Sequence, residues 1–423
     1  MVSCLRLIMI LHQNPKTRIT IYSKSFLCFF LCFFVISKGA AQTEFQWNLL
    51  ADMELSRAGA QSHFYYNEID KDHRDLRVGL SQLNVIGKLM LNANWMINGR
   101  VLLERDKGIK TNRLVFPQLN VQWLSKERRF GITAGSFINP FGAFNEKQLS
   151  IDRDFIGLPL AYSYYVNISD QTGFTEGLGD IADIRVNNTR QWGSTIMYYG
   201  GYSTGALFSW NLIPGKVNWK TALVTGASNS QKSFTDPLHA GIISRLKVQA
   251  TYFWEQGLSL SHGSFLRKSE VSTGLDQFRN FRQTLIGTDF RLGMGFLEVS
   301  GELIGVFYKT PVLKVDDDQF DPATWDTPVT LSGFSGYANV KYELPFLPGS
   351  YLAYRIDRLD FGEESYTNTS VNWDNDVLRH SLAAGYRISQ NLLARVFVST
   401  QSVDNKSWDK TQRTFRFVLT VHY

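Results

Sequence analysis

The sequence predicts an all-β protein, a transmembrane antiparallel up-and-down β-barrel formed by residues 42–423. Three observations support this fold class. Apolar and polar residues alternate with a period of two along most of the chain, as in strands with two different faces. The alternating segments are about ten residues long, enough for a tilted strand to cross a bilayer. Short connections alternate with long ones, whereas a soluble sandwich would have short turns at both ends.

Residues 1–41 are predicted to be a cleaved signal peptide. Lys16, Arg18 and Lys24 precede an apolar run from Phe26 to Ile36, and small residues follow up to Ala41. A basic region, an apolar core and a small-residue cleavage site in this order are typical of export signals. The apolar run of about eleven residues is shorter than the roughly 20 that a spanning helix needs.

Removal of the signal changes the composition of the chain. The whole sequence carries a formal charge of +6, and the signal holds five basic residues and no acidic one, so the mature chain carries +1. All three cysteines, Cys4, Cys28 and Cys32, also lie in the signal. We therefore expect no disulfide, no thiolate chemistry, no nucleic-acid partner and no cofactor.

The first and last strands have the clearest alternation. Apolar residues from Phe45 to Leu55 alternate with polar ones, with Leu50 as an exception. Near the end, Phe415, Phe417, Leu419, Val421 and Tyr423 alternate with Thr414, Arg416, Thr420 and His422. Similar segments run from Leu91 to Glu104 and from Leu297 to Phe307. The mature chain contains no linker and no shift in composition, so a single domain is expected.

The number of strands is predicted from a count of the alternating segments and from the requirement that the number be even. Counting gives about seventeen candidates, and single-chain bacterial barrels have an even number, which leaves sixteen with fourteen or eighteen as alternatives. The segment Trp192–Tyr199 is the misfit, and it could instead continue the strand Gly205–Ile213. The long connections are Arg57–Asp75, Asn139–Arg190, Ser228–His239, Lys309–Thr330 and Gly362–Asp376, and tight turns include residues 125–128, 214–216, 293–295 and 389–391.

The polar side of the strands is predicted to line the lumen. A barrel of this size is too wide for its own side chains to fill, so we expect a water-filled channel. Opposed basic and acidic walls would orient polar solutes, although the same charges could simply pair with one another. The predicted lining residues are Arg100, Glu104, Arg245, Lys247, Asp289, Arg291, Glu298, Glu302, Lys341, Arg355, Arg387 and Arg395, with Asp52, Glu54, Glu343, Asp357, Arg379 and Arg416 on the same faces.

Two segments carry a resemblance to known proteins. The final strand of alternating aromatics that ends at Tyr423 resembles the terminal signature of Gram-negative outer-membrane barrels. The stretch Gly135–Gly142, followed by Ile151–Phe155, is similar to phosphate-selective and related sixteen-stranded porins, at the entry to their constriction loop. The resemblance implies passive diffusion through the outer membrane, insertion by the barrel-assembly machinery, contact with lipid and lipopolysaccharide, and a homotrimer. Those porins line their channel with basic residues, whereas a charge of +1 predicts weak selectivity here.

The segment Asn139–Arg190 is therefore the predicted constriction loop. Its charged and aromatic residues could contact a sugar or another small polar solute, because rings offer an apolar face beside polar tips. The alternative is a loop whose tyrosines pack on its own core. The candidate residues are Asp152, Arg153, Asp154, Tyr162 and Tyr164.

Other functions have weaker support. The acidic run Asp316–Asp318 lacks the spacing of a calcium loop, so no metal site is predicted. His380 and Ser381 are adjacent but project to opposite faces of one strand, and no hydrolase motif is present, so no enzyme is predicted. The runner-up to a diffusion channel is a non-channel barrel that acts in adhesion or scaffolding through its extracellular loops, and an outer-membrane hydrolase comes last.

Overall fold

A computed structural model gives the structure of the chain. It describes residues 43–58, 75–106, 111–171, 173–176, 194–199, 201–229, 240–266, 280–316, 319–366, 369–404 and 412–423. The predicted signal peptide, residues 1–41, lies outside the described residues, as do Asp317 and Asp318.

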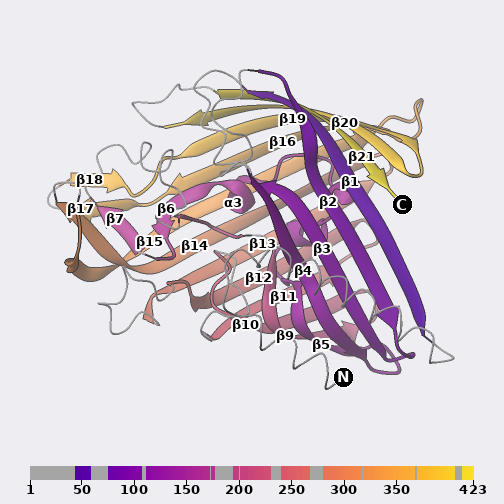
Figure 1. Ribbon diagram of the computed structural model, residues 1–423, viewed down its shortest axis with the longest axis horizontal. Coiled ribbons are helices and arrows are strands. Elements are labelled where there is room, and N and C mark those ends of the chain that lie inside the picture. Colours follow the sequence, from indigo (N-terminus) through magenta and orange to yellow (C-terminus); the bar gives the residue numbers. More distant parts are fainter. Residues whose placement is uncertain are drawn as a thin grey trace, which may run out of the picture.

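Sixteen antiparallel strands form a closed barrel, as the sequence predicted (Figure 1). The barrel closes where the first strand pairs with the last, and Leu49 and Tyr423 exchange two backbone hydrogen bonds of 2.9 and 2.8 Å there. A closed sheet leaves no unpaired strand edge in lipid. In order around the wall, the strands are β1 (Glu44–Ala58), β2 (Arg77–Met90), β3 (Trp95–Asp106), β4 (Thr111–Leu124), β5 (Phe130–Ile138), β9 (Tyr202–Ile213), β10 (Val217–Thr225), β11 (Ala240–Gln249), β12 (Trp254–Ser264), β13 (Arg282–Met294), β14 (Leu297–Asp316), β15 (Gln319–Glu343), β16 (Ser350–Phe361), β19 (Val377–Ser389), β20 (Leu392–Val403) and β21 (Gln412–His422).

The two ends of the barrel differ in their connections. Short turns, such as residues 125–129, 214–216 and 390–391, join the strands at the end where β21 also finishes, and we call this the turn end. The opposite end, the loop end, carries the long connections. Residues 309–330 were predicted as a loop, but β14 and β15 continue through most of this range as a hairpin, because cross-strand pairing extends to Asp316 and Gln319. The connection 362–376 contains a second hairpin, β17 (Glu363–Tyr366) with β18 (Thr369–Asn372).

The outer face of the wall is apolar. Along β16, outward Leu352, Tyr354 and Ile356 are exposed, while the inward residues between them are buried. Near the turn end, Trp210 stacks on Trp219 with ring centroids 5.2 Å apart. Such aromatic girdles are typical of the interfaces of a membrane barrel. The described part of the chain contains no helix that is long and apolar enough to span a membrane.

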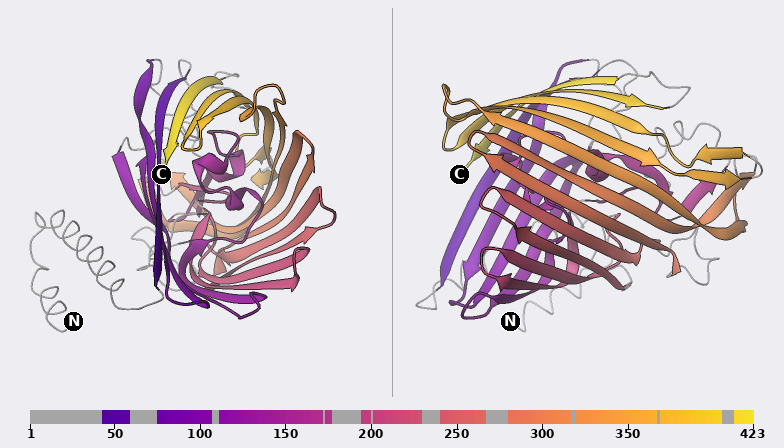
Figure 2. Two further views of the ribbon diagram at one scale, coloured as in Figure 1. Left: turned by 90° about the vertical axis from the view of Figure 1, so that its right-hand side faces the viewer. Right: turned by 180° about the vertical axis from the view of Figure 1, so that it is seen from behind.

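The connection between β5 and β9 turns into the barrel, and its described residues between 139 and 199 are called the insert (Figure 2). The insert contains two 3-10 turns, η3 (Phe144–Glu146) and η4 (Ser150–Asp152), and the short helix α3 (Leu160–Ser163). Three short strands follow, namely β6 (Tyr165–Ser169), β7 (Gly173–Glu176) and β8 (Ser194–Ile196). Because β8 pairs with β6, the described part of the segment Trp192–Tyr199, residues 194–199, supplies no strand of the barrel wall.

Candidate functional site: the lumen and its insert

The insert begins with a sharp bend at Asn139-Pro140-Phe141-Gly142. Gly142 has φ of +61°, a conformation that glycine adopts without strain. A side chain on Gly142 would also collide with the carboxylate of Glu302 on β14. Phe141 stacks on Tyr198 at the far end of the insert, with ring centroids 4.9 Å apart. Glycine is therefore required at this position for steric reasons. The chain enters the barrel here between the wall strand β14 and the last residues of the insert.

Arginines of the wall hold the insert by its main chain. Arg395 on β20 donates to the carbonyl oxygens of Ser150 and Arg153 at 2.6 and 3.1 Å. Arg355 on β16 donates to Gly157 at 2.9 Å, and Arg379 on β19 donates to Leu158 at 3.1 Å. The three guanidiniums are buried. A buried cation is stable only with partners, and the carbonyl dipoles of the insert supply them.

Side chains of the insert also bond to the wall. Tyr162 donates its hydroxyl to Glu302 at 2.8 Å, and Ser150 donates to Asp52 on β1 at 3.0 Å. Glu146 accepts a hydrogen bond of 2.7 Å from Arg245 on β11. Arg245 in turn holds Asp289 on β13 through two bonds of 3.1 and 2.7 Å. Opposite walls of the barrel are thereby connected through one inserted segment.

The charge of Glu146 depends on its wall partners. Burial alone would raise the pKa of Glu146, but the positive charges of Arg245 and Lys247 outweigh burial and hold this pKa below its usual value. Burial raises the pKa of Asp152, although Arg153 and Lys147 nearby favour its charged form. The two insert carboxyls therefore differ in acidity because only Glu146 makes a direct ion pair with a guanidinium.

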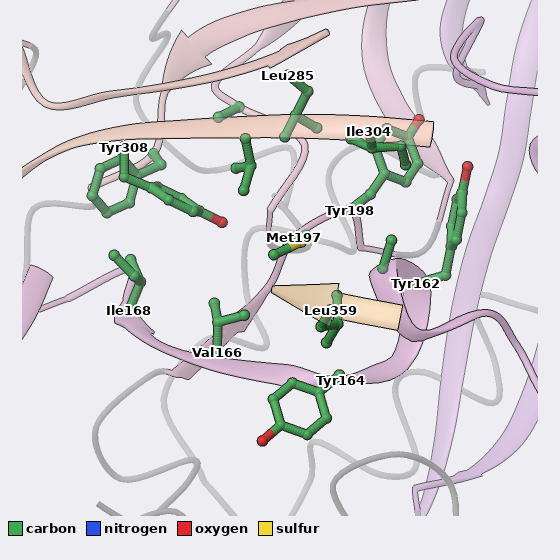
Figure 3. Packing of buried hydrophobic residues seen from close by; sticks show 14 of the residues in the cluster. Tyr162, Tyr164, Val166, Ile168, Met197, Tyr198, Leu285, Ile304, Tyr308 and Leu359 are labelled. Carbon is green, nitrogen blue, oxygen red and sulfur yellow. The ribbon is translucent and has the colours of Figure 1, made fainter. Parts of the chain in front are cut away.

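Toward the loop end, an apolar cluster lies between the insert and the wall (Figure 3). Val166, Ile168 and Met197 of the insert pack there with Leu285 and Leu359, which point inward from the wall. Tyr162 and Tyr164, predicted to contact solute, are both buried in this cluster. The ring of Tyr162 packs on Phe144 and Tyr198 of the insert, and its hydroxyl bonds to the wall, so the packing differs from the surface loop with its own core that the sequence left open. The described wall residues at this height are therefore covered by the insert.

Two cavities lie beside the insert on the side of the turn end. The first has a volume of about 400 Å³ and lies between Asp152–Asp154 of the insert and Lys341, Tyr351 and Arg387 of the wall. The second, which we call the amide cavity, has a volume of about 360 Å³. Its wall residues include Asn98, Gln118, Asn120, Gln122, Asn218, Lys220, Arg245 and Lys247, and Phe137, Phe141 and Glu146 complete the lining.

The predicted lining residues fall into two groups. One group is buried by contacts with the insert or with the wall, and it comprises Arg100, Arg245, Asp289, Glu302, Arg355 and Arg395, with Asp52, Glu54, Asp357, Arg379 and Arg416 beside them. The other group is partly or fully exposed and comprises Glu104, Lys247, Arg291, Glu298, Lys341, Glu343 and Arg387, with Asp152, Arg153 and Asp154 of the insert.

Ion pairs join members of the exposed group. Lys147 lies 3.4 Å from Glu298, Lys341 lies 3.4 Å from Asp154, and Arg291 donates to Glu298 at 2.8 Å. Sequence reasoning missed Glu146, Lys147 and Lys220. The alternation of β10 was a usable signal for Lys220, because this residue follows the exposed Trp219 and therefore points inward.

The pair considered for hydrolysis lies apart in space. His380 is on the outer face of β19, where its Nδ1 lies 2.7 Å from the hydroxyl of Tyr354. Ser381 is on the inner face, buried beside Ser399 at 3.1 Å between the two hydroxyl oxygens. A serine nucleophile needs a histidine within hydrogen-bond reach, and these two side chains do not meet.

The fold is shared with known outer-membrane channels. No protein-family model and no curated protein matches the chain. Among solved structures, it is similar to the anion-selective porin from Comamonas acidovorans, with a TM-score of 0.56 and 11% identity over 90% of this chain and 100% of that one. It is also similar to the outer membrane channel DcaP of Acinetobacter baumannii, with a TM-score of 0.54 and 11% identity over 91% and 99%. A third is OmpT, an outer membrane protein of Vibrio cholerae in a trimer form, with a TM-score of 0.52 and 7% identity over 90% and 99%. The chain therefore has the porin-type fold, a closed antiparallel barrel of the outer membrane.

Proposed function

We propose that the chain is an outer-membrane channel through which small polar solutes diffuse passively past the insert. The observation that carries this proposal is the pair of polar cavities between the insert and the wall, both lined by charged side chains. A barrel that served only as a structural body would gain nothing from charged cavities, because unpaired polar surface inside a protein costs free energy. The porin-type fold supports the same function.

The solute path in this proposal runs along the exposed group of wall residues. Its wall residues are the cations Lys247, Arg291, Lys341 and Arg387 and the carboxylate Glu298, and Asp152, Arg153 and Asp154 of the insert form the constriction. Cations and anions are mixed along this path and many are paired, so we expect weak ion selectivity. The insert covers the wall at mid-height, so we also expect a conductance well below that of an open barrel of the same strand number.

Planar bilayers test this proposal. The purified mature chain should give a stable ohmic conductance, and a variant in which a short Gly-Ser linker replaces residues 148–157 should give a larger one. An unchanged conductance in that variant would place the constriction elsewhere. If neither protein conducts in repeated preparations, the diffusion function is wrong.

One observation favours a second candidate, a barrel that does not conduct. The apolar cluster fixes the insert to the wall inside the barrel toward the loop end, as a permanent plug would be fixed. Such a barrel would act in adhesion or scaffolding through its long connections. This second candidate would be supported if the linker variant conducts ions in planar bilayers and the unmodified chain does not.

We further propose that the exported chain, after loss of residues 1–41, is inserted by the barrel-assembly machinery, contacts lipopolysaccharide and forms a homotrimer. The trimer form described for OmpT of Vibrio cholerae supports the oligomer only by analogy of fold. Light scattering of the detergent-solubilised protein tests the trimer, and a monomeric mass would contradict it.

A further inference from the structure

We propose that the amide cavity is a binding site for a hydroxylated carboxylate, a sugar acid of monosaccharide size, whose carboxylate is recognised by Lys220. This inference rests on the proposed channel function, because it names the class of solute that the channel would take. It concerns one cavity and one cation, and it can therefore be tested apart from conductance.

The cavity is lined by carboxamides on neighbouring strands. Asn98 on β3 donates to Asn120 and Gln122 on β4, at 3.0 and 3.4 Å. Gln118, which precedes Asn120 by two residues on β4, makes no side-chain hydrogen bond within the described part of the chain. A carboxamide both donates and accepts, and so does a sugar hydroxyl, so a row of amides suits a polyhydroxylated ligand.

Lys220 is the charged residue that distinguishes this cavity. Its ammonium makes no hydrogen bond and no ion pair within 4.0 Å to any residue that the structure describes, although the charge of Glu146 acts on it from a longer distance. The other two cations of the cavity hold Glu146 directly: Lys247 lies 3.4 Å from it, and Arg245 is bonded to Glu146 and Asp289. An ammonium whose only nearby carboxylate is already bound by two other cations favours a ligand that brings one negative charge of its own.

The shape of the cavity narrows the ligand class further. A volume of about 360 Å³ accommodates a monosaccharide with some water. A small inorganic anion would use Lys220 but would leave the amides without contacts.

Isothermal titration of the detergent-solubilised mature chain tests the proposal with three probes. D-galacturonate carries both hydroxyls and a carboxylate, D-galactose lacks the charge, and acetate lacks the hydroxyls. We expect galacturonate to bind roughly tenfold or more tightly than either of the other two, since a hydrogen bond to a charged group contributes about 1.5–3 kcal/mol. Equal binding of galacturonate and galactose, or of galacturonate and acetate, would overturn the proposal.

Two variants locate the site. Lys220→Gln should remove the preference for galacturonate over galactose while galactose binding persists, which also shows that the variant is folded. Arg387→Gln removes the same charge from the lumen but lines the other cavity, so it should keep the preference. If both variants lose the preference for galacturonate, the cause is a diffuse charge effect and the assignment to Lys220 is overturned. The assignment is also overturned if Lys220→Gln keeps the preference.

Conductance separates this inference from the proposed function. Binding of galacturonate without conductance in bilayers would leave the site standing and contradict solute passage. Conductance without binding of any of the three probes would support the channel and overturn the site.

Discussion

Single residues inside the barrel hold the insert in a way that needs arginine. Arg355 donates through Nε to Asn339 at 2.7 Å and through Nη1 to Gly157, while its guanidinium lies 4.2 Å from the ring centroid of Phe155. A planar group with several donors can bond the wall and the insert together and still stack on a ring. Lysine offers a single nitrogen and could not make this set of contacts.

We predict that Arg395→Met loosens the insert. The substitution removes the hydrogen bonds from the guanidinium to the carbonyl oxygens of Ser150 and Arg153, and the loss of a hydrogen bond to a charged group costs about 1.5–3 kcal/mol. The free energy of unfolding in urea should fall by at least this amount, and single-channel conductance should rise. Arg291→Met is the matched control, because this exposed arginine pairs only at the surface and its loss should cost about 0–1 kcal/mol. Equal losses in the two variants would contradict the docking role.

We predict that Gly142→Ala destabilises the chain more than Gly295→Ala. Both glycines have positive φ, at +61° and +59°, so both substitutions carry a backbone cost of about 1–3 kcal/mol. Only at Gly142 does the new methyl group also meet a neighbour, the carboxylate of Glu302, whereas the space around Gly295 is open. The difference between the free energies of unfolding of the two variants in urea measures the cost of the steric clash at Gly142, because the backbone cost is common to both. Equal destabilisation would show that the entry of the insert is not tightly packed.

At the scale of elements, the strands could be predicted and the insert could not. The alternation from Phe415 to Tyr423 reflects a local rule, one face in lipid and one face inward, and β21 follows it. The position of the insert depends on contacts such as Arg395 to Ser150, between residues 245 positions apart. No local pattern encodes that partner, so the arginines were predicted to face solute. The tyrosines were misplaced for the same reason, because their environment is supplied by distant wall strands.

We predict that acid releases the insert through Glu146. Its pKa in the folded chain lies below the usual 4.5, so the ion pair with Arg245 stabilises the docked insert in full above pH 4.5. This stabilisation is lost as the pH falls through the lowered folded value. Conductance should therefore stay constant down to pH 4.5 and rise only at more acidic pH. Glu146→Gln should show part of that rise already at pH 7 and a smaller acid response; identical pH profiles would exclude Glu146 as the sensor.

At the scale of the whole molecule, apolar and polar side chains are distributed in the opposite way to those of a soluble protein. Large apolar residues such as Trp47 and Leu303 are exposed outside, while Arg416 and Glu54 are bonded to each other inside the wall at 2.9 and 2.8 Å. Lipid is the solvent of the outer face, so polar groups must find partners within the barrel. The even strand number and the two-faced pattern could be predicted because this constraint acts on every strand alike.

We predict that Leu303→Lys weakens the folded barrel in lipid vesicles by about 2–4 kcal/mol, the cost of a lysine near the middle of the membrane. Phe346→Lys is the control, because Phe346 lies in the turn 344–349 and is exposed there. Its replacement should change the free energy of unfolding by no more than about 1 kcal/mol. A similar cost at both positions would mean that Leu303 does not face lipid.

The manner in which the wall holds the insert also bears on how this protein can change over generations. Arg355, Arg379 and Arg395 bond to carbonyl oxygens, which every amino acid possesses. Side chains between Ser150 and Leu158, other than Ser150 and Phe155, which contact the wall themselves, can therefore be exchanged while the same arginines keep the same carbonyl partners. New solute preferences can arise by mutation of the insert alone, without a compensating change in the wall, and a library that varies only these positions is a practical route to redesigned permeability.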